Sequence, residues 1–121
     1  MYSVLFVSHD ADLRAAAQRV LERAGFRVAT AAHADHATLV CAYGPVDVVV
    51  IENKMPEGPG RTIAAQLHRY CPGLAVVVMC DQQVAIPPDE TAVVRPFTAE
   101  DLTDAVGHAV ARQILRAATS L

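Results

Sequence analysis

Short apolar runs alternate along the chain with segments in which apolar residues recur every three or four positions. Residues 4–7, 46–51 and 75–79 form valine-rich runs, which predict strands buried on both faces of a sheet. Residues 27–31 and a short segment around 93–94 predict two further strands. Strands separated by helix-length segments favour parallel pairing through right-handed crossovers. The pattern therefore predicts an α/β domain, a doubly wound (βα)5 unit with a five-stranded parallel sheet.

Boundary residues mark the helices between these strands. Asp10 can cap a helix that ends before Gly25, and residues 34–43 predict a second helix that stops at Gly44-Pro45. Residues 55–60, a loop with two prolines and two glycines, lead into a third helix. Its apolar face is predicted to consist of Ile63, Ala64, Leu67 and Tyr70.

The fourth helix is predicted to be shortened or missing, whereas the last helix is long. Only ten residues separate Cys80 from Thr91, and they include Pro87-Pro88, which cannot sit inside a regular helix. Thr98 and Asp101 resemble a capping box for a helix over residues 99–119. Its apolar stripe comprises Leu102, Val106, Ala109, Val110, Ile114 and Ala117. We expect one domain over residues 1–121, with 113–121 as a helical extension or a linker to an output module.

Composition narrows the functional classes. Ten Lys and Arg against thirteen Asp and Glu give a formal net charge of −3, which argues against nucleic-acid binding through this domain. No apolar run approaches the roughly 20 residues of a membrane helix, and the first residues do not resemble a secretory signal. Cys41, Cys71 and Cys80 are odd in number and lack a C-x-x-C spacing, as in a reducing compartment. We therefore expect a cytoplasmic protein without membrane contacts.

Candidate chemistry gathers where the predicted strands end. In an open parallel sheet, ligands bind outside the carboxyl ends of the strands. These ends carry Ser8-His9-Asp10, Glu52-Asn53, Cys80-Asp81 and Arg95-Pro96-Phe97.

Three segments resemble the receiver domain of two-component response regulators. They are residues 4–14, residues 47–56, with Met55-Pro56 after a Val/Ile strand, and residues 93–97, with a basic residue before Pro-Phe. The resemblance spans residues 2 to about 115. It implies the flavodoxin-like, CheY-like fold with strand order 2-1-3-4-5, and a bacterial two-component (phosphorelay) signalling role. It also implies metal-assisted phosphoryl transfer to an aspartate, in which each participant has a physical task.

The acceptor and metal positions implied by this resemblance are substituted. The phosphoacceptor position falls on Glu52, whose carboxylate is one methylene farther from the backbone than that of aspartate. The acidic pair that holds magnesium falls on Ser8 and His9, with Asp10 one position later. An imidazole is a poor substitute for a hard carboxylate ligand of Mg²⁺. We expect weak magnesium affinity and no metal site, and the weak candidate ligands are Asp10 and Glu52.

The switch positions are substituted as well. The family's phosphate-contacting hydroxyl falls on Cys80, its switch aromatic on Ala92 and its lysine on Arg95, a planar fork instead of a point charge. Pro96 is the candidate for a cis peptide bond. These departures indicate a degenerate pseudo-receiver, without enzymatic activity and without a cofactor.

Charge supplies a hypothesis for the remodelled site: Glu52 and Arg95 form an ion pair that locks one conformation. The domain would then be a phosphorylation-independent protein-interaction module, which binds a protein partner or a second copy of itself, in part through the C-terminal helix. The alternative is a switchable sensor, whose pocket binds a metal ion or an anion through Asp10, Glu52, Cys80 and Arg95.

Overall fold

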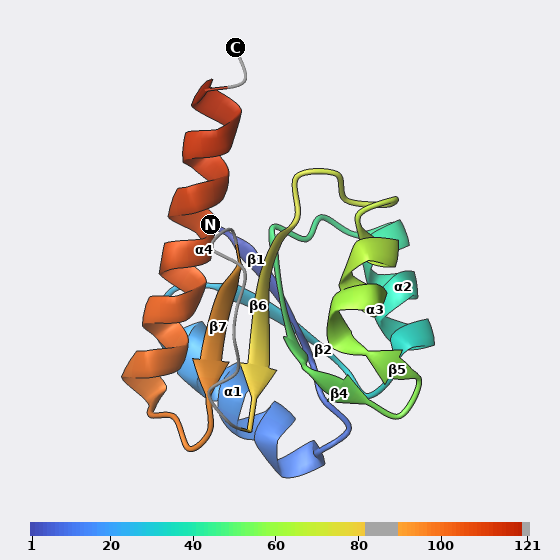
Figure 1. The fold of residues 1–121 in the computed structure, drawn as a ribbon. Helices are drawn as coiled ribbons and strands as arrows, with labels where there is room; N and C mark the ends of the chain where they lie inside the picture. The colour runs from blue at the N-terminus through green and yellow to red at the C-terminus, as the bar shows by residue number, and fades with distance from the viewer. Residues whose placement is uncertain (82–89, 120–121) are drawn as a thin grey trace.

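A parallel sheet of five strands forms the middle layer, and helices cover both of its faces (Figure 1). The computed structural model describes residues 1–81 and 90–119. The strand order is β2-β1-β3-β6-β7, which confirms the predicted 2-1-3-4-5 arrangement once the strands of this sheet are counted along the chain. The strands are β1 (Ser3–Val7), β2 (Arg27–Ala31), β3 (Val48–Glu52), β6 (Ala75–Cys80) and β7 (Thr91–Val94).

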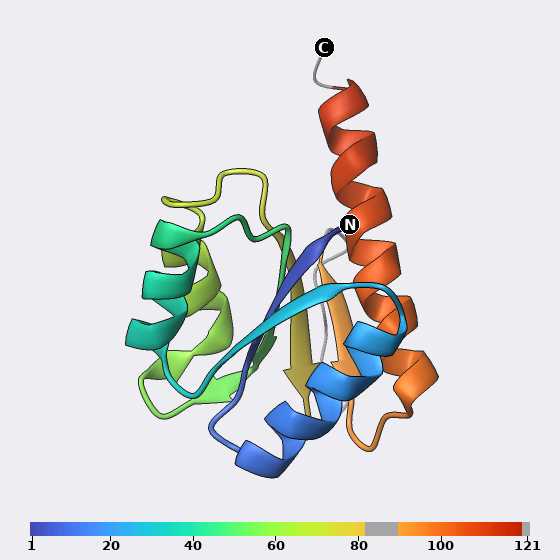
Figure 2. The same ribbon diagram turned by 180° about the vertical axis from the view of Figure 1, so that it is seen from behind.

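Among the described residues, two helices pack on each face of the sheet (Figures 1 and 2). One face is covered by α1 (Ala11–Arg23) and α4 (Ala99–Thr119), the other by α2 (Ala34–Tyr43) and α3 (Gly60–Leu67). Along β1, Val4 and Phe6 belong to the first core, whereas Leu5 and Val7 belong to the second. Because successive side chains of a strand point to opposite faces, a strand covered on both sides must be apolar throughout.

Capping interactions fix the starts of the two helices on the first face. The Asp10 carboxylate accepts a hydrogen bond from the Leu13 amide at 3.1 Å, which confirms it as the cap of α1. At α4, the Asp101 amide donates to Thr98 Oγ1 at 3.0 Å and the Thr98 amide donates to Asp101 Oδ2 at 2.9 Å. This reciprocal pair is the predicted capping box. Gly25, just after α1, has φ +97°, which a residue with a side chain rarely adopts.

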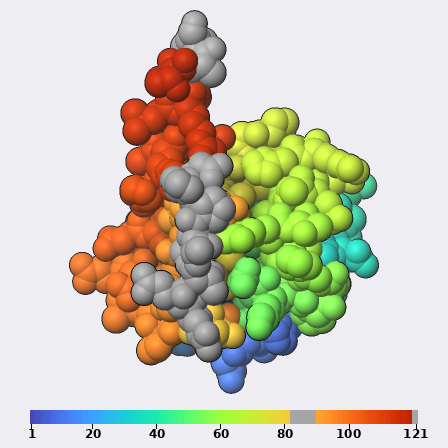
Figure 3. Space-filling model, viewed as in Figure 1, coloured from blue at the N-terminus to red at the C-terminus, as the bar shows by residue number. Residues whose placement is uncertain are grey.

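The long last helix is buried only in its first half. Leu102, Val106, Ala109 and Val110 lie in the core, as predicted. The second half extends past the sheet (Figures 1 and 3), and there Ile114 is 52% exposed. Ile114 therefore does not continue the buried stripe.

Two local expectations need correction, and one lies outside the described residues. The segment predicted as a loop contains a small antiparallel hairpin, β4 (Lys54–Met55) and β5 (Gly58–Pro59). Tyr70 is 52% exposed and lies beyond the end of α3 at Leu67, so it does not belong to that helix's buried face. The shortened or missing fourth helix falls on residues 82–89, outside the described part of the chain. Over residues 1–81 and 90–119, no helix combines the length and apolarity needed to cross a membrane.

Candidate functional site

The carboxyl ends of β1, β3, β6 and β7 form one edge of the sheet and bring the predicted site residues to it. Backbone hydrogen bonds hold the edge together: the Asn53 amide donates to the Met79 carbonyl and the Arg95 amide to the Cys80 carbonyl, each at 2.8 Å. Ser8, Glu52 and Cys80 are buried. A cavity of about 220 Å³ at this edge is lined by Glu52, Asn53, Lys54, Met79, Cys80, Asp81 and Arg95.

Glu52 and Arg95, which both line this cavity, form an ion pair, as the sequence predicted. Arg95 Nη2 donates a hydrogen bond to Glu52 Oε1. The Glu52 side chain is only 7% exposed, whereas that of Arg95 is 31% exposed. The peptide bond between Arg95 and Pro96 is cis, as expected for Pro96. A carboxylate this deeply buried requires a cationic partner, and Arg95 supplies one.

Two further ionisable side chains, those of His9 and Asp81, flank the pair and form a row with it. His9 Nδ1 lies 2.8 Å from Glu52 Oε2, and Asp81 Oδ1 lies 3.6 Å from Arg95 Nε. The sequence placed His9 at this edge, at a position where the family carries a metal ligand, and it gave Asp81 no role. The position of Asp81 directly after a buried strand was the feature of the sequence that could have predicted its place at this edge. The His9 and Asp81 side chains at the two ends of the row are largely exposed, whereas Glu52 within it is buried.

Polar groups of the first strand end have partners within the chain. The Asp10 carboxylate is engaged at the start of α1, and Ser8 Oγ accepts a hydrogen bond from the Asp10 amide at 3.1 Å. Arg14 Nη1 donates to the Ser8 carbonyl at 2.7 Å, which places a guanidinium beside this strand end. Within the described residues, no group of three or more His, Cys, Asp or Glu side chains is arranged to hold a metal ion. The candidate ligands Asp10 and Glu52 instead contact the Leu13 amide and the Arg95 guanidinium, respectively.

Cys80 and Ala92 occupy the switch positions that the resemblance implies. Burial raises the pKa of the Cys80 thiol, nearby Arg61 lowers it, and Asp81 and Glu90 raise it. Cys80 is therefore a neutral thiol and a weak hydrogen-bond donor where the family carries a hydroxyl. Ala92 lies in β7 and is partly buried, and its methyl side chain cannot swing between buried and exposed positions as an aromatic ring can.

Thiol reactivity tests this description of the edge. Burial, with Cys71 nearby, raises the pKa of Cys41 to about 12, and burial raises that of Cys80. Because the thiolate is the reactive form, we expect iodoacetamide at mildly alkaline pH to modify the more exposed Cys71 first. Peptide mass mapping of the native protein measures the order of modification. Modification of Cys80 as fast as that of Cys71 would show that the carboxyl edge opens in solution.

A doubly wound domain with an acidic residue facing a cation at its carboxyl edge has the architecture of a signalling receiver. The family described as "Response regulator receiver domain" matches residues 4–107. The chain therefore belongs to the response regulator receiver domain family.

Solved receiver structures share this fold at low sequence identity. A CheY-like receiver protein from Methanospirillum hungatei JF-1 superposes with a TM-score of 0.81 at 17% identity, covering 96% of this chain and 98% of that one. A receiver domain protein from Clostridium thermocellum gives 0.78 at 22% identity, with 95% and 98% covered. Chemotaxis protein CheY4 from Vibrio cholerae gives 0.80 at 20% identity, with 90% and 98% covered. No curated protein matches the chain.

Proposed function

We propose that this receiver domain works without phosphorylation, as a non-enzymatic protein-interaction module that the Glu52–Arg95 pair holds in one state. The observation that carries the proposal is the ion pair itself: the side chain at the phosphoacceptor position is buried and engaged by a cation. Phosphoryl transfer to a carboxylate requires an oxygen that is aligned with the donor. Here Oε1 accepts a hydrogen bond from Arg95, and Oε2 lies against His9.

The chemistry of the surrounding donors also argues against the family's magnesium ion. Mg²⁺ requires oxygen ligands in near-octahedral geometry, usually carboxylates and water. The two family positions carry Ser8 and His9, Asp10 caps α1, and Glu52 is paired with Arg95. These residues do not fit a magnesium site.

The exposed end of α4 supports a role in binding a protein or a second copy of the chain. Ile114 and Leu115 are 52% and 63% exposed on the part of the helix that extends past the sheet (Figure 1). Contiguous exposed apolar side chains mark interaction surfaces more often than isolated ones.

Treatment with acetyl phosphate and Mg²⁺, followed by intact-mass spectrometry, tests the proposal. We expect no phosphoryl adduct on the wild-type protein, because the acceptor is paired and the metal ligands are missing. The variant Glu52→Asp alone should also remain unmodified. The double variant His9→Asp with Glu52→Asp restores one carboxylate ligand and the acceptor, and is the control in which an adduct is expected to appear. A phosphoryl group on wild-type Glu52 would contradict the proposal.

A further inference from the structure

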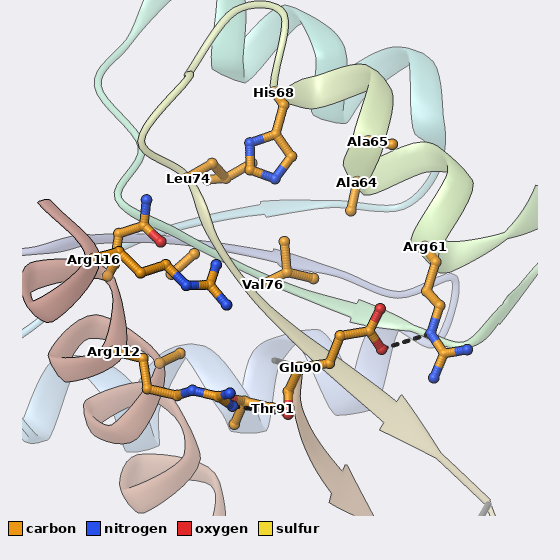
Figure 4. A pocket seen from close by; sticks show the side chains of 13 residues that line it. Arg61, Ala64, Ala65, His68, Leu74, Val76, Glu90, Thr91, Arg112 and Arg116 are labelled. Carbon is orange, nitrogen blue, oxygen red and sulfur yellow. Dashed lines mark hydrogen bonds and ion pairs between the residues drawn. The ribbon is translucent and has the colours of Figure 1, made fainter. Parts of the chain in front are cut away.

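Two of the three cysteines lie together at the amino edge of the sheet, where its strands begin. Cys41 is in the last turn of α2, which leads into β3, and Cys71 is in the turn that joins α3 to β6. His68 and Leu74 flank this turn and line a cavity (Figure 4), whereas the Cys71 side chain contacts α2. The third cysteine, Cys80, ends β6 and so belongs to the opposite, carboxyl edge.

The Cys71 thiol is directed at the backbone of Cys41. Cys71 Sγ donates a hydrogen bond to the Cys41 carbonyl oxygen at 3.6 Å, although the two positions are 30 residues apart along the chain. The two thiols also form a side-chain hydrogen bond with each other. Both cysteines are free, and both pack in the core between the sheet and the helices α2 and α3. A disulfide requires two cysteines that the fold brings close together, and these contacts do so.

Backbone hydrogen bonds hold the turn around Cys71 in place. The Cys71 amide donates to the Leu67 carbonyl at 3.1 Å, and the Leu74 amide donates to the Cys71 carbonyl at 3.0 Å. Cys41 is held by the regular backbone of α2. Because both thiols are carried by ordered backbone, a reaction between them is intramolecular and benefits from a high effective concentration.

The two thiols differ in their access to solvent. Cys41 is only 3% exposed, whereas Cys71 is half-buried. Burial, together with the nearby Cys71 thiol, raises the pKa of Cys41 to about 12, so Cys41 is a neutral thiol. Oxidation of a thiol depends on its exposure and on the fraction present as thiolate. A small oxidant therefore reacts at Cys71 first, and Cys41 is the thiol that reacts next with the oxidised Cys71.

We propose that Cys41 and Cys71 are a redox modification site, at which hydrogen peroxide produces a reversible disulfide. The Cys71 thiolate attacks one peroxide oxygen and the O–O bond breaks, which leaves a sulfenic acid on Cys71 and a hydroxide that takes up a proton to give water. The Cys41 sulfur then attacks the Cys71 sulfur and loses its proton, and the S–O bond breaks to release a second water. Two thiols are thereby oxidised, and one peroxide is reduced to two waters.

The disulfide joins α2 covalently to the turn before β6. The chain between the two cysteines contains β3, the β4–β5 hairpin and α3, so the bond closes a loop around this part of the domain. Its formation requires neither Glu52 nor Arg95, because both lie at the opposite edge of the sheet. A thiol reductant restores the two cysteines.

Treatment of the full chain with millimolar hydrogen peroxide, followed by iodoacetamide in denaturant and intact-mass spectrometry, tests the proposal. The untreated wild type should take up three carbamidomethyl groups, one on each cysteine. The oxidised wild type should take up only one, on Cys80, and dithiothreitol should restore all three. The variant Cys80→Ala is the matched control, which should form the same disulfide and take up no label after oxidation.

Two further variants assign the roles of the two cysteines. In Cys41→Ala, oxidation should stop at the sulfenic acid, which dimedone traps on Cys71. In Cys71→Ala, the two remaining thiols should both stay free, and this half-buried position makes the substitution compatible with folding. The proposal is overturned if the oxidised wild type keeps three free thiols, or if Cys71→Ala loses two thiols as the wild type does. Because thiols are counted and no phosphoryl donor is present, the outcome is independent of whether Glu52 can be phosphorylated.

Discussion

Replacing Arg95 with methionine is expected to lower the free energy of unfolding by about 2–3 kcal/mol, since it leaves the buried Glu52 carboxylate without its main cation. Breaking a fully buried pair costs about 3–5 kcal/mol. The expected loss is smaller here because Arg95 is 31% exposed and His9 still lies beside Glu52. Urea unfolding followed by circular dichroism measures the change.

The reverse substitution is expected to be milder. In Glu52→Gln, the Arg95 guanidinium keeps Asp81 nearby and can turn toward solvent, so we expect a loss of about 1 kcal/mol. The double variant Glu52→Gln with Arg95→Met buries no unpaired charge and should be more stable than Arg95→Met alone. This recovery is the coupling that a double-mutant cycle measures.

A second arginine provides the matched control for this cycle. Arg61 and Glu90 form an ion pair whose side chains are 39% and 27% exposed. This pair is more exposed than the Glu52–Arg95 pair, so Arg61→Met is expected to cost less, about 1 kcal/mol. If Arg95→Met is no more destabilising than Arg61→Met, the Glu52–Arg95 pair does not hold the edge together.

Replacing Gly60 with alanine is expected to lower the free energy of unfolding by about 3 kcal/mol, at the upper end of the usual cost of overpacking. Gly60 begins α3, and its amide donates to the Asn53 carbonyl at 2.9 Å. A Cβ at this position would overlap the backbone oxygen of Glu52 and lie 3.0 Å from its carbonyl carbon. The backbone oxygen and carbonyl carbon of Glu52 cannot shift unless β3 or the β4–β5 hairpin also moves.

Gly107 is the matched control for this substitution. It lies inside α4, and a Cβ there would meet nothing within 4 Å. Gly107→Ala should raise the free energy of unfolding by about 0.5–1 kcal/mol, because alanine loses less backbone entropy in a helix. Thermal melts should show a lower melting temperature for Gly60→Ala and a higher one for Gly107→Ala than for the wild type. Equal stability of Gly60→Ala and the wild type would mean that α3 does not approach Glu52 so closely.

The sheet could be predicted because its pattern is local. A strand covered on both faces needs an unbroken apolar run, as at residues 4–7. Helix starts at Asp10 and Thr98 followed from side chains that bond to nearby amides. The hairpin of β4 and β5 was missed because each strand has two residues, too few to show any periodicity. Tyr70 was misplaced because the apolar spacing continues past the end of α3.

The part of the candidate site that depends on the positions of the strand ends could be predicted. Parallel strands bring their carboxyl ends to one edge, so the meeting of Glu52 and Arg95 followed from charge and from the strand order that the family resemblance implies. The contact of His9 with Glu52 depends on the side-chain direction at a strand end, which the sequence does not state. A second cavity of about 240 Å³, lined by residues of α3, the start of β6 and α4, was not predicted, because these segments form no joint pattern along the chain.

The most direct measurement of the central claim compares two-dimensional ¹H–¹⁵N NMR spectra before and after addition of acetyl phosphate and Mg²⁺. If the Glu52–Arg95 pair holds the domain in one state, the amide signals of Ser8, Asn53 and Arg95 should keep their positions. New or displaced signals for these residues, after correction for ionic strength, would show a carboxyl edge that still responds to magnesium or phosphorylation, and would contradict this account.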